Sequence, residues 1–598
     1  MSVRRERFVT TRQFLETARS YDIDTEECIL EALDNSFDAS ANEISINVSF
    51  ENERIRIMIV DNGVGIPTTH IDENNITHQG IPYVLAYGGR IPHPGKTTIG
   101  KFGWGLSQAA SSLSSRTEIF SKTINDSDWR FGYYDFKELE NSENCELEPE
   151  VSSMPPTIDI HETGTVVIFY MDRSEYKSIN GVVKMIQKNL GRVYRKFIQN
   201  GAKISISFPS GKKMEIEEIT INDPIHQIPG SKQVSMFGTS KGPFTHTIPL
   251  DGRNSLGAYI DPNTGKYAEI IVHICLLDIQ NIRNKLGITG SGAGRKLSQW
   301  GIGNEHQGFS IMRNGREIRR SETLGLWTKG RPHQYIRGEI EFPEILDKLF
   351  NVQVNKSRFT INSSLRNIID NECNRTIRSL VKESRNNATK RNLQNKKKQT
   401  PPAELIVGMM KDYIPKVELT KQEKQDGEVR KKEKIQAIIA KAENEGDQKI
   451  LSAKENLLEA KESRDSERIT YAEESVKIAI ADKKSSVKQI RNRFEFDSPI
   501  RKEFGVLGSG DMYAIEHLGE EVWITMNTDT PFFRLVYEKA LMKPEEESLL
   551  DLMIFAMAWA EHMKRNEPSI KQFWEEARPV VSQNAHLFCS YMRLEDES

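Results

Sequence analysis

Three polar residues on one face of an expected helix could do chemistry. Glu31, Asn35 and Asp38 are spaced by four and three residues within the helical pattern at 25–41, so their side chains share a face. A carboxylate can activate a water molecule. An asparagine carbonyl is a hard oxygen ligand that suits Mg²⁺. Such a face is more often simply solvated, so the chemistry depends on what lies nearby.

Three glycine-bearing segments follow this helix. They are Asp61-Asn-Gly63-Val-Gly65-Ile66 after a strand pattern, Gly100-Lys101-Phe102-Gly103-Trp-Gly105-Leu106 before a helix pattern, and Gly164-Thr165 at the start of a strand. Glycines just before a helix leave backbone N–H groups open to phosphate oxygens, and the positive helix end favours the same ligand. Each segment alone also occurs in ordinary turns, so their order and spacing carry the inference.

The elements that must position these residues form an α/β pattern over 1–172. Alternating apolar residues predict a hairpin of strands at 44–50 and 55–59, a helix at 106–113, and strands at 117–121, 129–136 and 165–171. Residues 67–99 are rich in Gly, Pro, His and Thr and lack periodicity. That segment is too long for an ordinary connection, which predicts a lid or binding loop.

A second α/β region is expected at 173–375, with a helix at 179–199 and strands at 203–208, 268–277 and 308–312. Its glycine-rich run at 287–295 lacks the Gly-Lys-Ser/Thr ending of a phosphate-binding loop, which favours a flexible loop. Residues 376–415 are expected to form a basic linker, because 374–398 hold nine basic residues against one acid, a net charge of +8.

The remainder divides into a charged arm and a terminal module. Residues 416–496 carry charges of both signs and predict long solvated helices, with a coiled coil possible although the apolar positions keep no clean heptad. Residues 497–598 are expected to form a small, mostly helical module with a strand at 522–526 and a buried helix at 549–563. That module could serve dimerisation or bind a partner protein.

Composition sets outer limits on these assignments. A length of 598 residues corresponds to about four domains at ~150 residues each. The formal net charge of −3 gives no whole-chain field that would indicate a nucleic-acid or membrane partner, so any such partner must be read from local patches. No stretch approaches the ~18 apolar residues of a membrane span, and the charged start has no apolar region behind it. These features predict a cytoplasmic protein without a membrane partner. The five cysteines are scattered without a CxxC pair, which argues against a disulfide framework or a zinc site.

Taken together, the four motifs between residues 25 and 170 resemble those of the GHKL ATPases, the superfamily of gyrase, heat-shock ninety chaperones, histidine kinases and MutL proteins. The resemblance implies an N-terminal Bergerat-fold α/β sandwich that binds ATP and Mg²⁺. Residues 307–318, 337–343 and 354–359 resemble the S5-like transducer domain of the microrchidia (MORC) ATPases and their bacterial relatives. An α/β (α+β) architecture of ATPase, transducer, helical arm and terminal module follows.

The resemblance also implies a role for each motif residue. Glu31 would be the catalytic base, and Asn35 the Mg²⁺ ligand. Asp61 and Thr165 would contact adenine, while Gly63 and Gly65 let the base approach. A second catalytic residue, Lys356, would reach the γ-phosphate from the transducer. The further nucleotide-binding residues would be Asp38, Ile66, Gly100, Lys101, Phe102, Gly103, Gly105 and Leu106.

The function so implied is that of a slow ATPase acting as an ATP-dependent homodimeric clamp. DNA would be the target, because the basic segment near 375–398 could contact several phosphates, and bacterial relatives suggest a role in anti-phage or restriction-type defence. Two alternatives stay open: a chaperone like heat-shock ninety, with protein clients, and an interaction scaffold stabilised by ATP. The chain lacks a helical hairpin before the ATPase region, an Asp-x-Asp motif after residue 360 and a zinc-nuclease motif. These absences argue against a histidine kinase, a type II topoisomerase subunit and a nuclease-bearing MutL protein.

Overall fold

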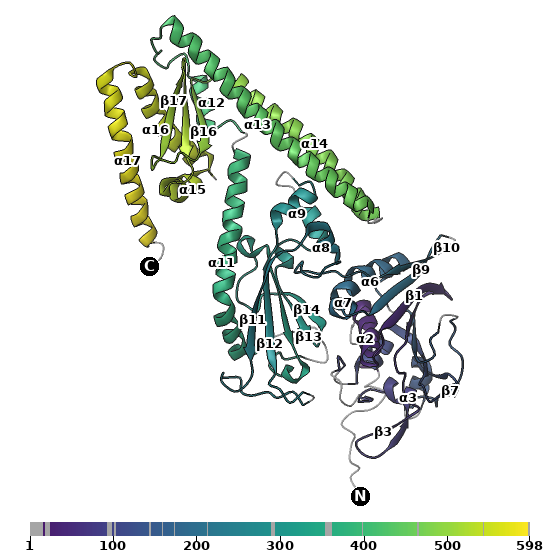
Figure 1. Cartoon of the computed structure of the whole chain (residues 1–598). Coiled ribbons are helices and arrows are strands. Elements are labelled where there is room, and N and C mark those ends of the chain that lie inside the picture. The colour runs from purple at the N-terminus through teal and green to yellow at the C-terminus, as the bar shows by residue number, and fades with distance from the viewer. Residues whose placement is uncertain are drawn as a thin grey trace. The chain divides into compact units, whose positions relative to one another are not determined.

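The computed structural model places most of the chain in two units (Figure 1). The described residues are 16–17, 24–92, 98–100, 103–142, 145–157, 160–172, 174–211, 213–262, 264–288, 294–352, 361–396, 399–462, 466–541 and 543–595. One unit comprises 1–279 with 294–381, and the other 280–293 with 382–598. Each unit is described by itself below.

The first sheet of the first unit has eight strands in the order β10-β9-β1-β2-β8-β5-β6-β7. Its strands are β1 (Glu43–Glu51), β2 (Arg54–Asp61), β5 (Ser114–Lys122), β6 (Arg130–Asp135), β7 (Val151–Ser152), β8 (Gly164–Met171), β9 (Lys203–Ser210) and β10 (Lys213–Glu218). Only the β1–β9 pair is parallel. The strands at 203–218 therefore belong to the sheet of the first region, beyond the expected boundary at 172.

Helices cover one face of this sheet and enclose its main core. They are α2 (Thr25–Asp38), α4 (Gly105–Leu113), α6 (Ile179–Val193) and α7 (Arg195–Gln199). Ile44, Ile46 and Val48 alternate along β1 and point into this core, as the sequence pattern predicts. Helix α2 begins where the Asp24 side chain accepts the Glu27 N–H. It ends at Asp38, three residues earlier than the pattern suggests. Further elements of this region are β3 (Thr69–Ile71), β4 (Thr77–Gln79), α3 (Gly80–Leu85) and α5 (Phe136–Asn141).

The second sheet has five strands in the order β11-β12-β15-β13-β14. These are β11 (Lys241–Pro249), β12 (Glu269–Leu276), β13 (Gly308–Arg313), β14 (Arg316–Glu322) and β15 (Ile336–Phe342), with short helices α8 (Lys232–Phe237), α9 (Ile279–Lys285) and α10 (Gly294–Gln299) nearby in the chain. Helix α11 (Ser363–Lys396) packs on this sheet through Leu365, Ile369, Cys373, Ile377 and Leu380. Residues 376–396, expected as a linker, continue α11 as helix. The reason is that Ile377 and Leu380 extend its apolar stripe.

The second unit contains a helical pair and a small α/β module. Helices α13 (Lys421–Glu462) and α14 (Ser466–Glu495) run antiparallel, since Asp447 pairs with Lys483 and Glu443 with Arg491. The module has β16 (Ile500–Gly505), β17 (Tyr513–Leu518) and β18 (Glu521–Asn527), with α12 (Pro402–Met409), α15 (Glu538–Ala540), α16 (Pro544–Met563) and α17 (Pro568–Glu595). It is thus less purely helical than expected. Over the described ranges, no helix is both long and apolar enough to cross a bilayer.

Candidate functional site

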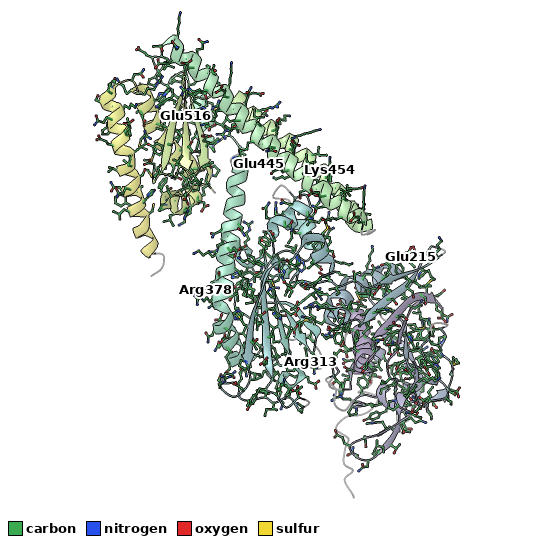
Figure 2. All side chains as sticks on the ribbon, in the orientation of Figure 1. Glu215, Arg313, Arg378, Glu445, Lys454 and Glu516 are labelled. Carbon is green, nitrogen blue, oxygen red and sulfur yellow. The ribbon has the colours of Figure 1, made fainter. Side chains whose placement is uncertain are left out.

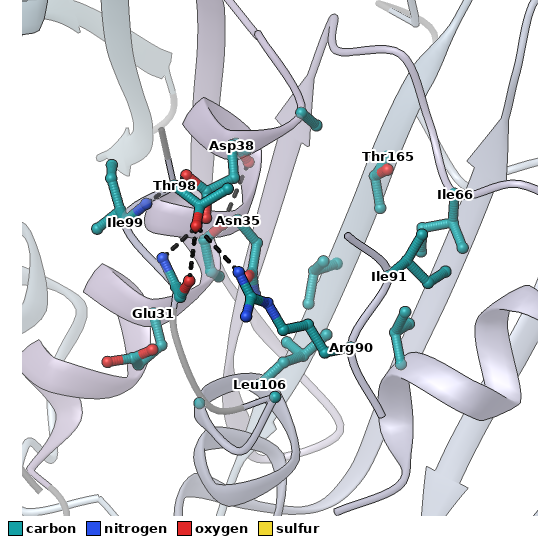
Figure 3. Close-up of a pocket in the computed structure, with 18 of the residues that line it drawn as sticks. Glu31, Asn35, Asp38, Ile66, Arg90, Ile91, Thr98, Ile99, Leu106 and Thr165 are labelled. Atoms are coloured by element: carbon teal, nitrogen blue, oxygen red, sulfur yellow. Dashed lines mark hydrogen bonds between the residues drawn. The ribbon is translucent and has the colours of Figure 1, made fainter. Parts of the chain in front are cut away.

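A single pocket collects most of the predicted site residues (Figure 3). It lies between α2, the ends of β2 and β8, and the start of α4, with a volume of about 210 Å³. The predicted residues that line it are Glu31, Asn35, Asp38, Asp61, Gly65, Ile66, Gly100, Gly103, Gly105, Leu106 and Thr165. Figure 3 shows the acidic face of α2 on one side of the pocket and Thr165 with Ile66 on the other. The site therefore has one wall formed by α2, which is acidic, and one formed by the strands, which carries Asp61 and Thr165 beside apolar residues.

Asp61, the last residue of β2, is a buried carboxylate held by three donors. Its Oδ1 accepts the N–H groups of Gly63 (2.9 Å) and Thr165 (3.1 Å), and its Oδ2 accepts the Ser36 hydroxyl (2.8 Å). Burial raises the pKa of Asp61 above its ordinary value, although the three hydrogen bonds oppose that rise. The carboxyl group is fixed in orientation at the inner end of the pocket.

The strand wall beside Asp61 is held by one serine hydroxyl. Ser121 Oγ accepts the Ile66 N–H at 2.8 Å and lies 3.1 Å from Thr165 Oγ1. Gly65 has a φ of +75°, and a Cβ there would lie 2.3 Å from the Lys122 carbonyl oxygen. Only glycine fits this close approach of two backbones. Thr165 and Ile66 are thereby brought to the same side of the pocket.

The helical wall brings Glu31 against the start of α4. A Cβ on residue 105 would lie 2.0 Å from Glu31 Oε2, so Gly105 is required for the glutamate to occupy its place. Asn35 is exposed, and its Oδ1 lies 3.9 Å from where a Cβ of residue 100 would be. An asparagine oxygen and a glutamate carboxylate thus face the glycine-bearing segment across a narrow gap.

Asp38 binds the backbone where the glycine-bearing segment begins. Its two oxygens accept the N–H groups of Ile99 (2.7 Å) and Gly100 (2.8 Å). Burial raises the pKa of Asp38 to about 6, against the lowering effect of those two hydrogen bonds. Since both oxygens are engaged with the backbone, Asp38 serves to place the loop. The direct nucleotide contact that the sequence suggests for Asp38 stays a prediction.

Comparison with known proteins agrees with this geometry. Residues 23–165 match the family described as "Histidine kinase-, DNA gyrase B-, and HSP90-like ATPase". These residues are a GHKL ATPase domain. The predicted superfamily is thereby confirmed for the N-terminal region, and the activity of such a domain is ATP binding with hydrolysis. The MORC-like resemblance of the rest of the chain stays a prediction.

One further comparison gives a distant structural similarity, and another gives no match. The crystal structure of the N-terminal domain of a DNA repair protein is similar at 16% sequence identity, over 62% of this chain and 98% of that one, with a TM-score of 0.35. No curated protein matches the sequence significantly. The family assignment therefore rests on residues 23–165 and the pocket they form.

The pocket chemistry of the ATPase domain fits Mg·ATP. Gly105 lets the Glu31 carboxylate lie directly against the start of α4, and the N-terminus of a helix is where phosphate groups bind. The described residues contain no cluster of three or more His, Cys, Asp or Glu side chains able to hold a metal ion by themselves. Mg²⁺ usually takes one or two protein oxygens and completes its shell with phosphates and water, and Asn35 lines the pocket with an oxygen of that kind.

Sequence reasoning missed several residues that line the ATPase pocket. Arg90 donates to Thr98 Oγ1 at 3.2 Å, and Arg313 reaches the pocket from the second sheet. Asn314-Gly315 after an apolar run does signal a tight hairpin, but no local pattern says where that hairpin docks. Gly63 donates to Asp61 and does not line the pocket. Lys101, Phe102 and Lys356 lie outside the described residues.

Proposed function

We propose that the chain is a Mg²⁺-dependent ATPase that uses ATP as a dimerisation switch, as the MORC-like resemblance implies. The observation that carries the proposal is the shared pocket of Asp61, Glu31 and the glycine segment. One end of the pocket has the fixed Asp61 carboxylate, and the other has the Glu31 carboxylate against the start of α4.

Each pocket residue has a proposed task. The Asp61 carboxylate and the Thr165 hydroxyl bind the adenine side of the nucleotide. Asn35 supplies an oxygen to Mg²⁺, whose charge offsets that of the phosphates. Glu31 orients and polarises the attacking water as general base.

Phosphate release tests the enzymatic part of the proposal. Glu31→Ala should bind Mg·ATP within about threefold of wild type while releasing phosphate at least about 100-fold more slowly, because a general base contributes 10²–10⁴-fold. Glu53→Gln, at an exposed turn, is the matched control and should behave as wild type. Equal turnover by wild type and Glu31→Ala would refute the role of Glu31.

Dimerisation is the second part of the proposal. The lid region at 67–99 would close over the nucleotide, two ATPase domains would associate, and Lys356 would approach the γ-phosphate. Light scattering of the full chain should show a doubled mass with Mg²⁺ and a non-hydrolysable ATP analogue, and a smaller mass with ADP. An unchanged mass in both states would contradict the switch.

DNA is the proposed target, and the surface of α11 supports it. Arg375, Arg378, Lys382 and Arg385 are all exposed, at spacings of three, four and three residues. They form one basic face opposite the stripe of Ile377 and Leu380, and Figure 2 shows Arg378 on that outer side. A row of cations along a helix suits the phosphates of a duplex. A defence role of the kind found among bacterial relatives would use this binding.

The salt dependence of DNA binding tests this target. Four phosphate contacts would give a slope of about −3.6 in log K against log salt, at about 0.9 per contact. Reversing the four α11 charges to Glu should flatten that slope by about 3.6 and weaken binding. Reversing the exposed Lys441, Lys449, Lys454 and Lys461 of α13 is the matched control. Equal binding by both variants would refute the α11 surface, and binding of unfolded protein clients instead would favour a chaperone.

A further inference from the structure

A two-residue turn of the second sheet follows an arginine, Arg313, that lines the nucleotide pocket. Strands β13 and β14 pair so that Arg313 lies opposite Arg316, with Asn314 and Gly315 between them. Their φ angles are 50° and 81°, as a type I′ hairpin turn requires at both central positions. This turn is short and conformationally restricted, so side chains flanking it are held in fixed directions.

Arg313 joins the second sheet to the start of the glycine segment. Its guanidinium is buried, with Nε and Nη2 bonded to the two Asp347 oxygens at 2.7 and 2.9 Å. Its Nη1 donates to the carbonyl oxygens of Thr98 (3.0 Å) and Ile99 (2.8 Å). The bidentate ion pair fixes the guanidinium plane, and the third nitrogen fixes two peptide groups of the pocket rim.

Two neighbouring side chains reinforce this contact. Asn314 Nδ2 also donates to the Thr98 carbonyl at 3.0 Å, and its Oδ1 accepts the Glu344 N–H at 3.1 Å. Glu344 in turn accepts the Thr98 N–H at 3.2 Å. On the opposite side, Asp38 accepts the next two N–H groups, those of Ile99 and Gly100. Residues around the second sheet therefore hold the carbonyls of Thr98 and Ile99 and the Thr98 amide, whereas α2 holds the amides of Ile99 and Gly100.

The other arginine of the turn fixes the helical wall. Arg316 is buried and forms an ion pair with Asp34, at 3.1 Å from Nη2 to Oδ2 and 3.2 Å from Nε to Oδ1. Tyr194 also donates to Asp34, at 2.7 Å. Asp34 directly precedes Asn35 on α2. One turn thus contacts both the helix that bears the proposed metal ligand and the loop that faces it.

We propose that the Arg313–Arg316 turn is a positioning element of the nucleotide site. It sets the distance between α2 and the 98–100 segment, so that phosphate binding requires the second domain, which contains the five-stranded sheet, to be docked. This inference rests on the proposed ATPase function. Arg313 is a positioning residue, since its donors are engaged by Asp347 and the backbone. By linkage, nucleotide binding should in turn stabilise the docking of the second domain.

Hydrogen exchange of the nucleotide-free full chain tests the positioning without relying on ATP binding. Arg313→Gln should increase exchange at least tenfold in the peptide that contains Ile99 and Gly100. Asp347→Asn, which releases the guanidinium, should do the same. Arg253→Gln, an exposed arginine of the same region, is the control and should leave that peptide unchanged. Equal exchange in wild type and Arg313→Gln would overturn the inference.

Nucleotide binding separates positioning from general destabilisation. Arg313→Gln should weaken Mg·ATP at least tenfold and adenosine less than twofold, because Asp61 and Thr165 lie away from the turn. Equal loss of both ligands would overturn the inference. If Arg313→Gln does not fold, Asn314→Gly retains the turn and the Arg313–Asp347 ion pair and removes the side-chain contacts with Thr98 and Glu344; the same split is then expected at threefold. Wild type that binds no nucleotide, yet shows the expected exchange pattern, would refute the proposed function and leave the positioning role standing.

Discussion

Asp61 offers the sharpest test of nucleotide recognition, because its hydrogen bonds can be accounted for one by one. A carboxylate has about four acceptor positions. The N–H groups of Gly63 and Thr165 fill both positions on Oδ1, and the Ser36 hydroxyl fills one on Oδ2. Within the described parts of the chain no other donor reaches Asp61, so one position on Oδ2 is left for the adenine amino group.

Asp61→Asn should replace the hydrogen-bond acceptor at that last position with a donor and leave the fold intact. The two backbone donors hold the amide oxygen at the place of Oδ1, so the amide nitrogen takes the place of Oδ2. Ser36 can then donate to the Ala32 carbonyl, which lies 3.2 Å from its hydroxyl, and accept from the new amide. Adenine would meet a donor in place of an acceptor. Loss of a hydrogen bond to a charged group costs about 1.5–3 kcal/mol, or a factor of about 10–150 in ATP affinity.

Calorimetric titration with Mg·ATP and Mg·ITP would measure this effect. Inosine carries an oxygen where adenine carries the amino group, so Asp61→Asn should lose affinity for ATP and gain relative affinity for ITP. Asp128→Asn, at an exposed turn of the same domain, should leave both affinities unchanged. Unaltered ATP affinity in Asp61→Asn, or an equal loss for ATP and ITP, would show that Asp61 does not read the base edge.

Three further changes probe the walls of the pocket. Gly105→Ala places a methyl group 2.0 Å from Glu31 Oε2; displacement of the base should slow phosphate release by about 100-fold, measured in a coupled assay. Asp34→Asn leaves the buried Arg316 guanidinium without its charge partner, so the free energy of unfolding in urea should fall by about 3–5 kcal/mol. A fall of less than about 1 kcal/mol would contradict a stabilising ion pair. Burial raises the pKa of Asp38 from 3.8 to about 6, so the folded state binds this proton more tightly than the unfolded state. Its contribution to the unfolding free energy should therefore fall as pH rises through that range. Wild type should show this fall in urea titrations and Asp38→Asn should not; parallel pH profiles would count against it.

The placement of the residues on the α2 side of the pocket could be predicted because it depends only on spacing along one helix. Glu31, Asn35 and Asp38 share a face by helical spacing, and the pocket contains all three. The apolar pattern predicts a helix that continues to residue 41, whereas α2 ends at Asp38. The helix ends earlier because Ser40, at a φ of 63°, leaves the helical conformation. Local pattern decides which residues are neighbours on a helix, and it says less about where the helix stops.

The contacts of the second sheet with the pocket could not be predicted. Arg313 and the Thr98 carbonyl are more than two hundred positions apart, and nothing in either segment encodes their meeting. The same applies to β9, which pairs in parallel with β1 across about 160 residues. Such pairings depend on how whole layers pack, which periodicity within a segment does not describe.

The parallel β1–β9 pair also means that the GHKL domain should not be isolated as a fragment that ends before β9. In a fragment ending at 172, β1 would be an edge strand. Residues 44–47 would keep their pairing with β2, but residues 43–47 would lack the hydrogen bonds that they form with β9. The fragment would also strip Val182, Ile186 and Leu190 of α6 from the core beneath. Bare sheet edges over exposed apolar surface recruit other chains. Self-association of such a fragment would report a missing strand and could be mistaken for the nucleotide-driven dimer, so the switch has to be studied in chains that extend past β10.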